Sequence, residues 1–93
     1  MDIEALKANF DFLLFERINP AQNEYRFYYL GWQPSLFDEG VVVRIAGRKL
    51  DGRQQVMAPL PYSSFEEAWP TIRALIRRRL RHGYQMVDAE ARS

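Results

Sequence analysis

The segment from residue 41 to residue 54 carries four cations against a single acid, Asp51. The cations are Arg44, Arg48, Lys49 and Arg53. Arginine holds a phosphate or carboxylate through two parallel N–H donors, whereas lysine acts as a compact point charge. The chemistry that these side chains predict is the binding of an anion.

A second group of cations follows at helical spacing near the end of the chain. Arg73, Arg77 and Arg81 are separated by steps of four, so they share one face of the expected helix. A basic stripe can follow a nucleic-acid backbone, but such stripes are more often the solvated side of an amphipathic helix. Similarly, cations on a hairpin can protect an exposed strand edge from pairing with other chains. Both interpretations stay open, and we carry Arg77 and Arg81 forward with the hairpin cations as candidate nucleic-acid contacts.

Residues for catalysis are lacking. The chain has no cysteine and one histidine, His82, and it contains no phosphate-loop or dinucleotide fingerprint. The paired acids Asp38-Glu39 and Glu66-Glu67 are adjacent in sequence, so their side chains point apart in a strand or a helix. His82 falls at the expected end of a helix, where a capping role is favoured. The sequence therefore predicts a protein that is not an enzyme and has no cofactor and no metal site.

Composition and charge bound the class of protein. The chain has 93 residues, of which 47% are hydrophobic and 27% charged, as expected for one globular domain. Residues 1–43 carry three cations against seven acids, a balance of −4, and residues 44–93 carry ten against five, a balance of +5. The apolar runs are too short to cross a bilayer, and the first residues lack the pattern of a signal peptide. Together with the absence of cysteine, this predicts a cytoplasmic protein without a membrane partner.

The elements that position these side chains are strands followed by a helix. Alternation and strand-forming residues predict four strands, at residues 12–18, 25–32, 41–48 and 53–58. Asp51-Gly52 is a strong signal for the turn of a hairpin between the last two strands. A helix is expected to begin after Ser64, because Glu67 completes a capping box, and to end at Gly83.

This order of elements predicts an α+β fold. We expect a twisted antiparallel sheet of about four strands, with a C-terminal helix packed across one face. Residues 1–11 are expected to be an N-terminal leader, residues 12–87 a single domain and residues 88–93 a frayed tail. Arg79 falls near the apolar stripe of the helix, so its stem is expected to pack there while its guanidinium reaches water.

Several short motifs between residues 16 and 84 occur together in a definite order. They are Glu16-Arg17-Ile18-Asn19-Pro20, Arg26-Phe27-Tyr28, Gln33-Pro34-Ser35-Leu36-Phe37, Val43-Arg44-Ile45-Ala46-Gly47-Arg48 and Arg77-Arg78-Arg79-Leu80-Arg81-His82-Gly83-Tyr84. In this order they resemble the WGR domain family, in particular its bacterial stand-alone members. Ala46 stands where the family has its name-giving tryptophan, while Gly47 and Arg48 remain. Gly47, Gly52, Gly83 and Tyr84 are expected to be structural residues of the motifs.

The resemblance implies a function in binding. In poly(ADP-ribose) polymerases this domain contributes to binding DNA ends, with the tryptophan and the arginine at the nucleic acid. The chain is therefore expected to be a non-catalytic binding module that contacts a DNA backbone through the basic hairpin and helix, without the stacking tryptophan. The alternative is a protein–protein interaction module or a homodimer that binds no nucleic acid, in which acidic and basic surfaces pair.

Overall fold

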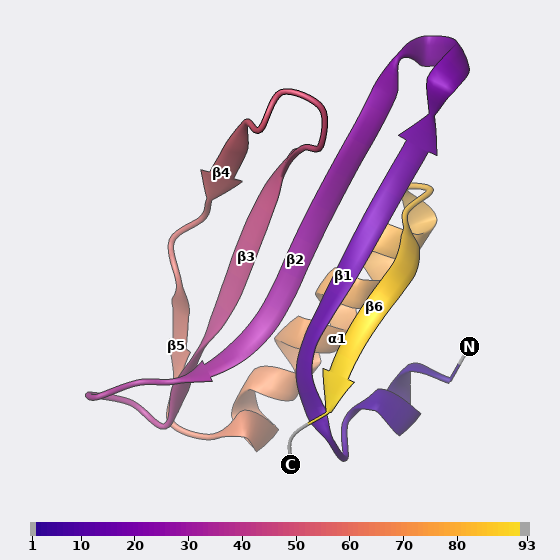
Figure 1. Ribbon diagram of the computed structural model, residues 1–93. Helices are drawn as coiled ribbons and strands as arrows, with labels where there is room; N and C mark the ends of the chain where they lie inside the picture. The colour runs from indigo at the N-terminus through magenta and orange to yellow at the C-terminus, as the bar shows by residue number, and fades with distance from the viewer. Residues whose placement is uncertain (1, 92–93) are drawn as a thin grey trace.

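One antiparallel sheet forms the frame of the molecule (Figure 1). The fold is taken from a computed structural model that describes residues 2–91. The strand order is β4-β3-β2-β1-β6, and β5 also pairs with β3. The strands are β1 (Phe10–Asn19), β2 (Glu24–Pro34), β3 (Gly40–Arg48), β4 (Gln54–Val56), β5 (Leu60–Tyr62) and β6 (Gln85–Ala91). The predicted α+β fold with an antiparallel sheet is confirmed, but the sheet has six strands rather than about four.

The two additional strands lie at opposite sides of the sheet. β5 is three residues long, contains Pro61 and pairs with the beginning of β3. β6 pairs with β1, so residues 88–91 belong to the sheet and the predicted frayed tail is wrong for them. Residues 92 and 93 lie outside the described residues. At the other end of the chain, β1 begins at Phe10, two residues before the expected start of the first strand, and a short 3-10 helix, η1 (Ile3–Leu6), precedes it.

The helix α1 (Phe65–Arg81) lies between β5 and β6 in the chain. The Ser64 side chain accepts a hydrogen bond of 3.1 Å from the backbone N–H of Glu67, which is one half of the predicted capping box. The carboxylate of Glu67 accepts its hydrogen bond from the Ser63 hydroxyl. Beyond the helix, Gly83 has a φ of 84°, which favours glycine and lets the chain turn back into β6. No helix within residues 2–91 is long and apolar enough to span a membrane.

The hydrophobic core fills the space between α1 and one face of the sheet. Alternate residues of β2 point towards the helix, and Tyr28, Leu30 and Trp32 are buried there. From α1 the buried residues are Ala68, Trp69, Ile72 and Ile76. The opposite face of the sheet has no helix over it and faces the viewer in Figure 1. The chain therefore has one covered face and one open face, and we keep these two names below.

Candidate functional site

A row of three arginines crosses the sheet on its covered face. Arg17 of β1 lies directly opposite Arg26 of β2, and Arg26 lies opposite Arg48 of β3. Cross-strand neighbours share one face of an antiparallel sheet, and like charges placed in this way repel each other. The row lies beside the end of α1: Arg17 donates a hydrogen bond of 2.8 Å to the carbonyl of His82.

The three arginines differ in how their charge is balanced. Arg17 forms an ion pair with Glu24, and its guanidinium also lies 5.4 Å from the centre of the Tyr84 ring. The hydrogen bond from Arg17 lowers the pKa of Glu24, so this pair is charged on both sides at neutral pH. Among residues 2–87, whose side chains the structure describes, Arg26 and Arg48 form no side-chain hydrogen bond and no ion pair. The two arginines are thus held side by side, and the nearest described influence is Glu24, whose pKa the charge of Arg26 also lowers.

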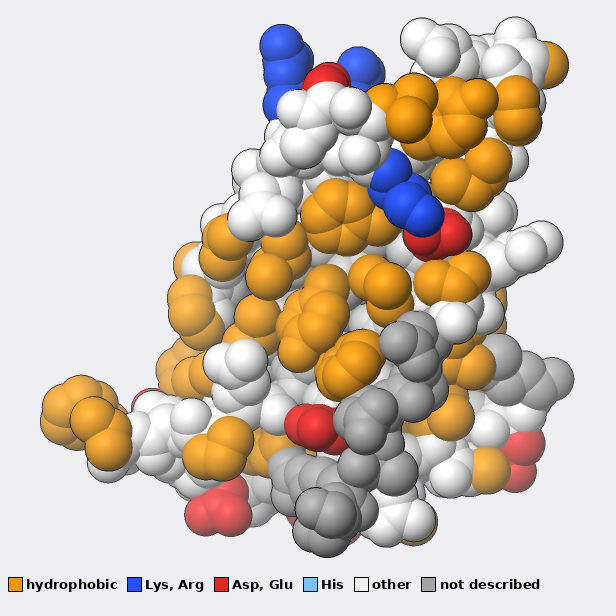
Figure 2. Space-filling view, viewed as in Figure 1, with side chains coloured by type: hydrophobic (Ala, Val, Ile, Leu, Met, Phe, Trp, Pro, Cys, Tyr) orange, Lys and Arg blue, Asp and Glu red, His pale blue; other side chains and the backbone are white. Residues whose placement is uncertain are grey.

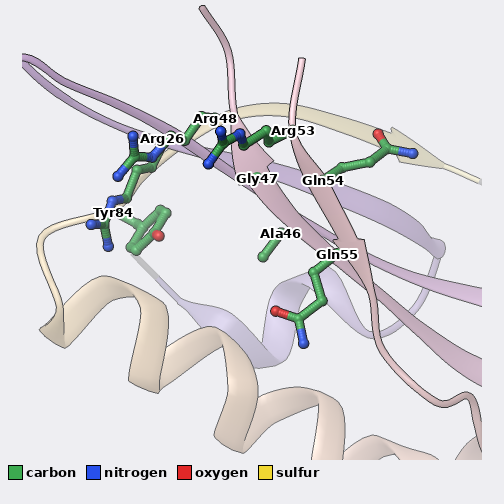
Figure 3. A pocket seen from close by; sticks show the side chains of 8 residues that line it. All are labelled: Arg26, Ala46, Gly47, Arg48, Arg53, Gln54, Gln55 and Tyr84. Carbon is green, nitrogen blue, oxygen red and sulfur yellow. The ribbon is translucent and has the colours of Figure 1, made fainter. Parts of the chain in front are cut away.

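A pocket of about 310 Å³ opens next to this row. It is lined by Arg26, Ala46, Gly47, Arg48, Arg53, Gln54, Gln55 and Tyr84 (Figure 3). The Arg53 side chain is 82% exposed, and its Nε is 3.7 Å from the Asp51 carboxylate, a loose pair at the hairpin turn. The pocket therefore combines three guanidinium groups with the amide side chain of Gln55 and the ring of one tyrosine, while the Gln54 side chain points away from it (Figure 3).

The hollow depends on two small residues of β3. Ala46 lies between Tyr28 and Gln55 on the neighbouring strands, and its methyl group leaves the space open. A Cβ atom at Gly47 would lie 2.2 Å from the carbonyl oxygen of Arg53 and 2.8 Å from the Phe27 ring. Only glycine allows the hairpin strand to approach this closely, so Gly47 fixes the position of Arg53 beside the pocket.

Between the pocket and α1, a guanidinium group stacks on two tyrosine rings, of which Tyr84 lines the pocket. The Arg79 guanidinium lies 4.6 Å from the centre of the Tyr28 ring and 5.4 Å from that of Tyr84. Its Nε is buried without a hydrogen-bond partner among the described residues. The stem and Nε of Arg79 are packed as predicted, and the two tyrosine rings hold the guanidinium at the edge of the core. That its outer nitrogens reach water stays a prediction.

A positive field surrounds the end of the helix. Desolvation lowers the pKa of His82, and so do the neighbouring charges of Arg79, Arg78, Arg81 and Arg17. The imidazole is therefore neutral at pH 7. An anion that binds nearby would oppose this repulsion and raise the same pKa.

The structure separates the six predicted contacts. Arg48 and Arg53 meet at the pocket, whereas Arg44 donates a hydrogen bond of 3.1 Å to the carbonyl of Ala58 and lies farther along the covered face. Lys49 forms an ion pair with Glu16 on the open face. Arg77 and Arg81 are exposed on α1 and do not line the pocket.

Sequence reasoning missed Arg26 and Gln55 as site residues. The period of two in β2 was sufficient to place Arg26 on the face of Tyr28 and Leu30, but the register that sets it opposite Arg48 was needed to show the row. Gln55 gave no signal, because an uncharged polar side chain on a short strand is common. Among the side chains that the structure describes, those of residues 2–87, no three His, Asp or Glu gather in a way that could hold a metal ion.

Comparison with protein-family models, with curated proteins and with solved structures gave no match to this chain. The resemblance to WGR domains therefore stays a prediction that depends on the motifs alone.

Proposed function

We propose that this chain is a non-catalytic module that binds the phosphate backbone of nucleic acid, with DNA as the expected ligand, through Arg26, Arg48 and Arg53. The observation that carries the proposal is the pair of opposed arginines, Arg26 and Arg48, which form no ion pair within residues 2–87. A phosphate bound between them would replace repulsion across the strands with two charge-assisted contacts.

The surroundings of the pair suit a phosphate ester. Gln55 supplies an amide donor and acceptor in the pocket lining, and Tyr84 supplies a ring surface. A pocket of about 310 Å³ is at the lower end of ligand-site volumes, roughly 300–1,000 Å³, so it fits one nucleotide unit and not a duplex. The rest of a longer ligand would run along the exposed surface, and contacts of this kind distinguish little between base sequences.

The test is fluorescence anisotropy with blunt and 5′-phosphorylated DNA duplexes over a range of salt concentrations. Three phosphate contacts predict a slope of roughly −2.7 in a plot of log K against log salt. Arg26→Ala and Arg48→Ala should each reduce affinity about tenfold and reduce the slope by roughly one contact.

Arg77→Ala is the matched control, since it removes the same charge from an exposed arginine outside the pocket. An equal loss in Arg77→Ala and Arg48→Ala would show that binding is diffuse and does not use the pocket. No binding at low salt would refute the proposal. Competition by inorganic phosphate or by a mononucleotide would show which part of the ligand the pocket holds.

A further inference from the structure

The open face of the sheet is apolar over several strands. The strand register places Phe12, Leu14, Phe27, Tyr29, Val43 and Ile45 on this face. Figure 2 shows hydrophobic side chains gathered over the middle of the sheet, broken mainly by one cation beside one acid. A sheet face in contact with water normally carries polar residues, and large contiguous apolar patches mark interaction sites.

Two aromatic rings cover the middle of the open face. Phe12 and Tyr29 stack with ring centres 5.4 Å apart and planes 23° apart. The Tyr29 ring lies across Gly31, because a Cβ there would be 2.9 Å from the ring atom Cε1. Apolar side chains on a sheet face are the surface against which a second sheet packs in sheet-on-sheet architectures.

The size of the face approaches that of a stable interface. The described sheet is five strands wide along its main path, although β4 has only three residues. At a spacing of about 4.8 Å per strand and about 26 Å for eight residues along a strand, the flat area is at most roughly 600 Å². The accessible surface of side chains exceeds this flat area, and a standard interface buries about 800 Å² on each partner.

Charge differs between the two ends of the same face. The end at the β2–β3 turn carries Asp38 and Glu39, and Asp11 lies near it. Burial and the nearby Asp11 carboxylate raise the pKa of Tyr29, which places this acid beside the apolar patch. The opposite end, at the β3–β4 turn, carries Lys49, which is paired with Glu16, and Arg53, whose side chain is 82% exposed at the turn.

We propose that the open face binds a second copy of this chain, as a two-fold symmetric dimer in which the two sheets stack with their strands antiparallel. A two-fold axis perpendicular to the strands sets the acidic end of one copy over the basic end of the other. A two-fold axis parallel to the strands would place acid over acid, so charge selects the first arrangement.

The same arrangement covers the exposed apolar residues at the turns. Leu36 and Phe37 at the β2–β3 turn are 96% and 94% exposed, and Leu50 at the β3–β4 turn is 71% exposed. Antiparallel stacking brings the first turn of one copy to the second turn of its partner, which buries all three side chains. The pocket on the covered face stays open, so the dimer presents two separate copies of it.

The test is the mass of the full chain by analytical ultracentrifugation. At roughly 100 µM protein, a standard-size interface predicts a mass of twice the 11.0 kDa chain. Ile45→Lys places a charge in the centre of the face and should weaken the dimer at least 100-fold. Ala74→Lys adds the same charge on the exposed side of α1 and should leave the dimer intact.

Circular dichroism confirms that the variants remain folded. If Ile45→Lys unfolds, Val56→Lys serves in its place, because Val56 pairs with Ile45 on the same face and is 61% exposed. A monomeric wild-type chain, or a dimer indifferent to either lysine in a folded variant, would overturn the proposal.

A charge exchange tests the orientation of the two copies. Asp38→Lys/Glu39→Lys should weaken the dimer about tenfold, and adding Arg53→Glu should recover part of that loss. Recovery supports antiparallel stacking, and a further loss would contradict it. The readout is mass alone, so the result is independent of whether the pocket binds nucleic acid.

Discussion

The two ends of α1 meet the same face of the sheet but differ in what surrounds their aromatic rings. At the beginning of the helix, Phe10, Phe65 and Trp69 pack with ring centres about 6 Å apart, and Phe10 and Trp69 are buried. At its end, Tyr28 and Tyr84 pack at a similar distance, but arginines lie over both rings. Both groups border a pocket, but their charged neighbours differ. Phe10 and Phe65 line theirs with Glu4, Lys7 and Glu66, a mixture of both signs. Tyr84 lines its pocket with arginines, and guanidinium groups also lie over the rings of Tyr28 and Tyr84. Aromatic content alone thus does not distinguish a core from a binding site, because the charges beside the rings differ.

Removal of the Trp69 ring at the beginning of α1 should have the largest effect on stability. Trp69→Ala leaves a cavity beside Phe10 and Phe65 and deletes the 3.1 Å hydrogen bond from the indole to Glu4. We expect a loss of about 3–5 kcal/mol in the free energy of unfolding, measured by urea denaturation. Arg77→Ala, at an exposed position of α1, is the control and should change stability by less than about 0.5 kcal/mol. Loss of DNA binding in a folded Trp69→Ala protein would contradict the separation of the two ends.

A change at Gly47 should affect both stability and binding. Gly47→Ala forces the strand carrying Arg53 away, since the added Cβ would collide with the carbonyl of that residue. We expect a loss of about 1–3 kcal/mol in unfolding free energy, with weaker DNA binding. Gly52→Ala is the control: Gly52 has a φ of 70° with no atom within 4 Å of an added Cβ. It should cost about 1 kcal/mol through backbone strain, with DNA affinity retained.

Filling the pocket should separate binding from stability more cleanly. Ala46→Leu adds three carbon atoms to the pocket lining and occupies space needed by a phosphate ester. We expect about a tenfold loss of affinity for DNA by anisotropy, and a change in unfolding free energy of less than about 1.5 kcal/mol. Unchanged affinity would mean that the ligand contacts the arginines without entering the pocket.

The smallest expected effect concerns the protonation of His82 at the end of α1. We expect the pKa of His82, measured by NMR titration of the imidazole, to lie below its ordinary value of 6.5 and to rise when DNA or phosphate binds. Because the folded pKa is lower than the unfolded pKa, the unfolded chain binds more protons between the two values. Stability should therefore rise with pH through that window and level off above it. A pKa that does not respond to saturating ligand would place the binding site elsewhere.

Local sequence signals predicted the parts of the fold that depend on neighbouring residues. The capping serine at position 64, the glycine after the helix and the alternation in β2 all correspond to what forms. β6 could not be found in this way, because its polar sequence becomes a strand only where the edge of β1 offers backbone partners. β5 is too short and too rich in proline to show a periodic pattern.

The candidate site was predicted in part. Because successive side chains of a strand point to opposite faces, the sequence alone could place Arg44, Ala46 and Arg48 on one face of β3 and Lys49 on the other. The partners of Lys49 and Arg44 could not be predicted. Glu16 and the Ala58 carbonyl are distant from these two cations in the chain and meet them only in the folded sheet. Arg26 required the register between two strands, which no local pattern specifies.

The pairing of β6 with β1 has a consequence for synthesis. β1 is synthesised before β6, so β1 gains this neighbour only after residues 85–91 have left the ribosome. Until then a ten-residue row of backbone donors and acceptors stays available to any other nascent chain. A ribosome that stalls within α1 would thus release a polypeptide prone to intermolecular strand addition, and prompt completion of translation protects against it.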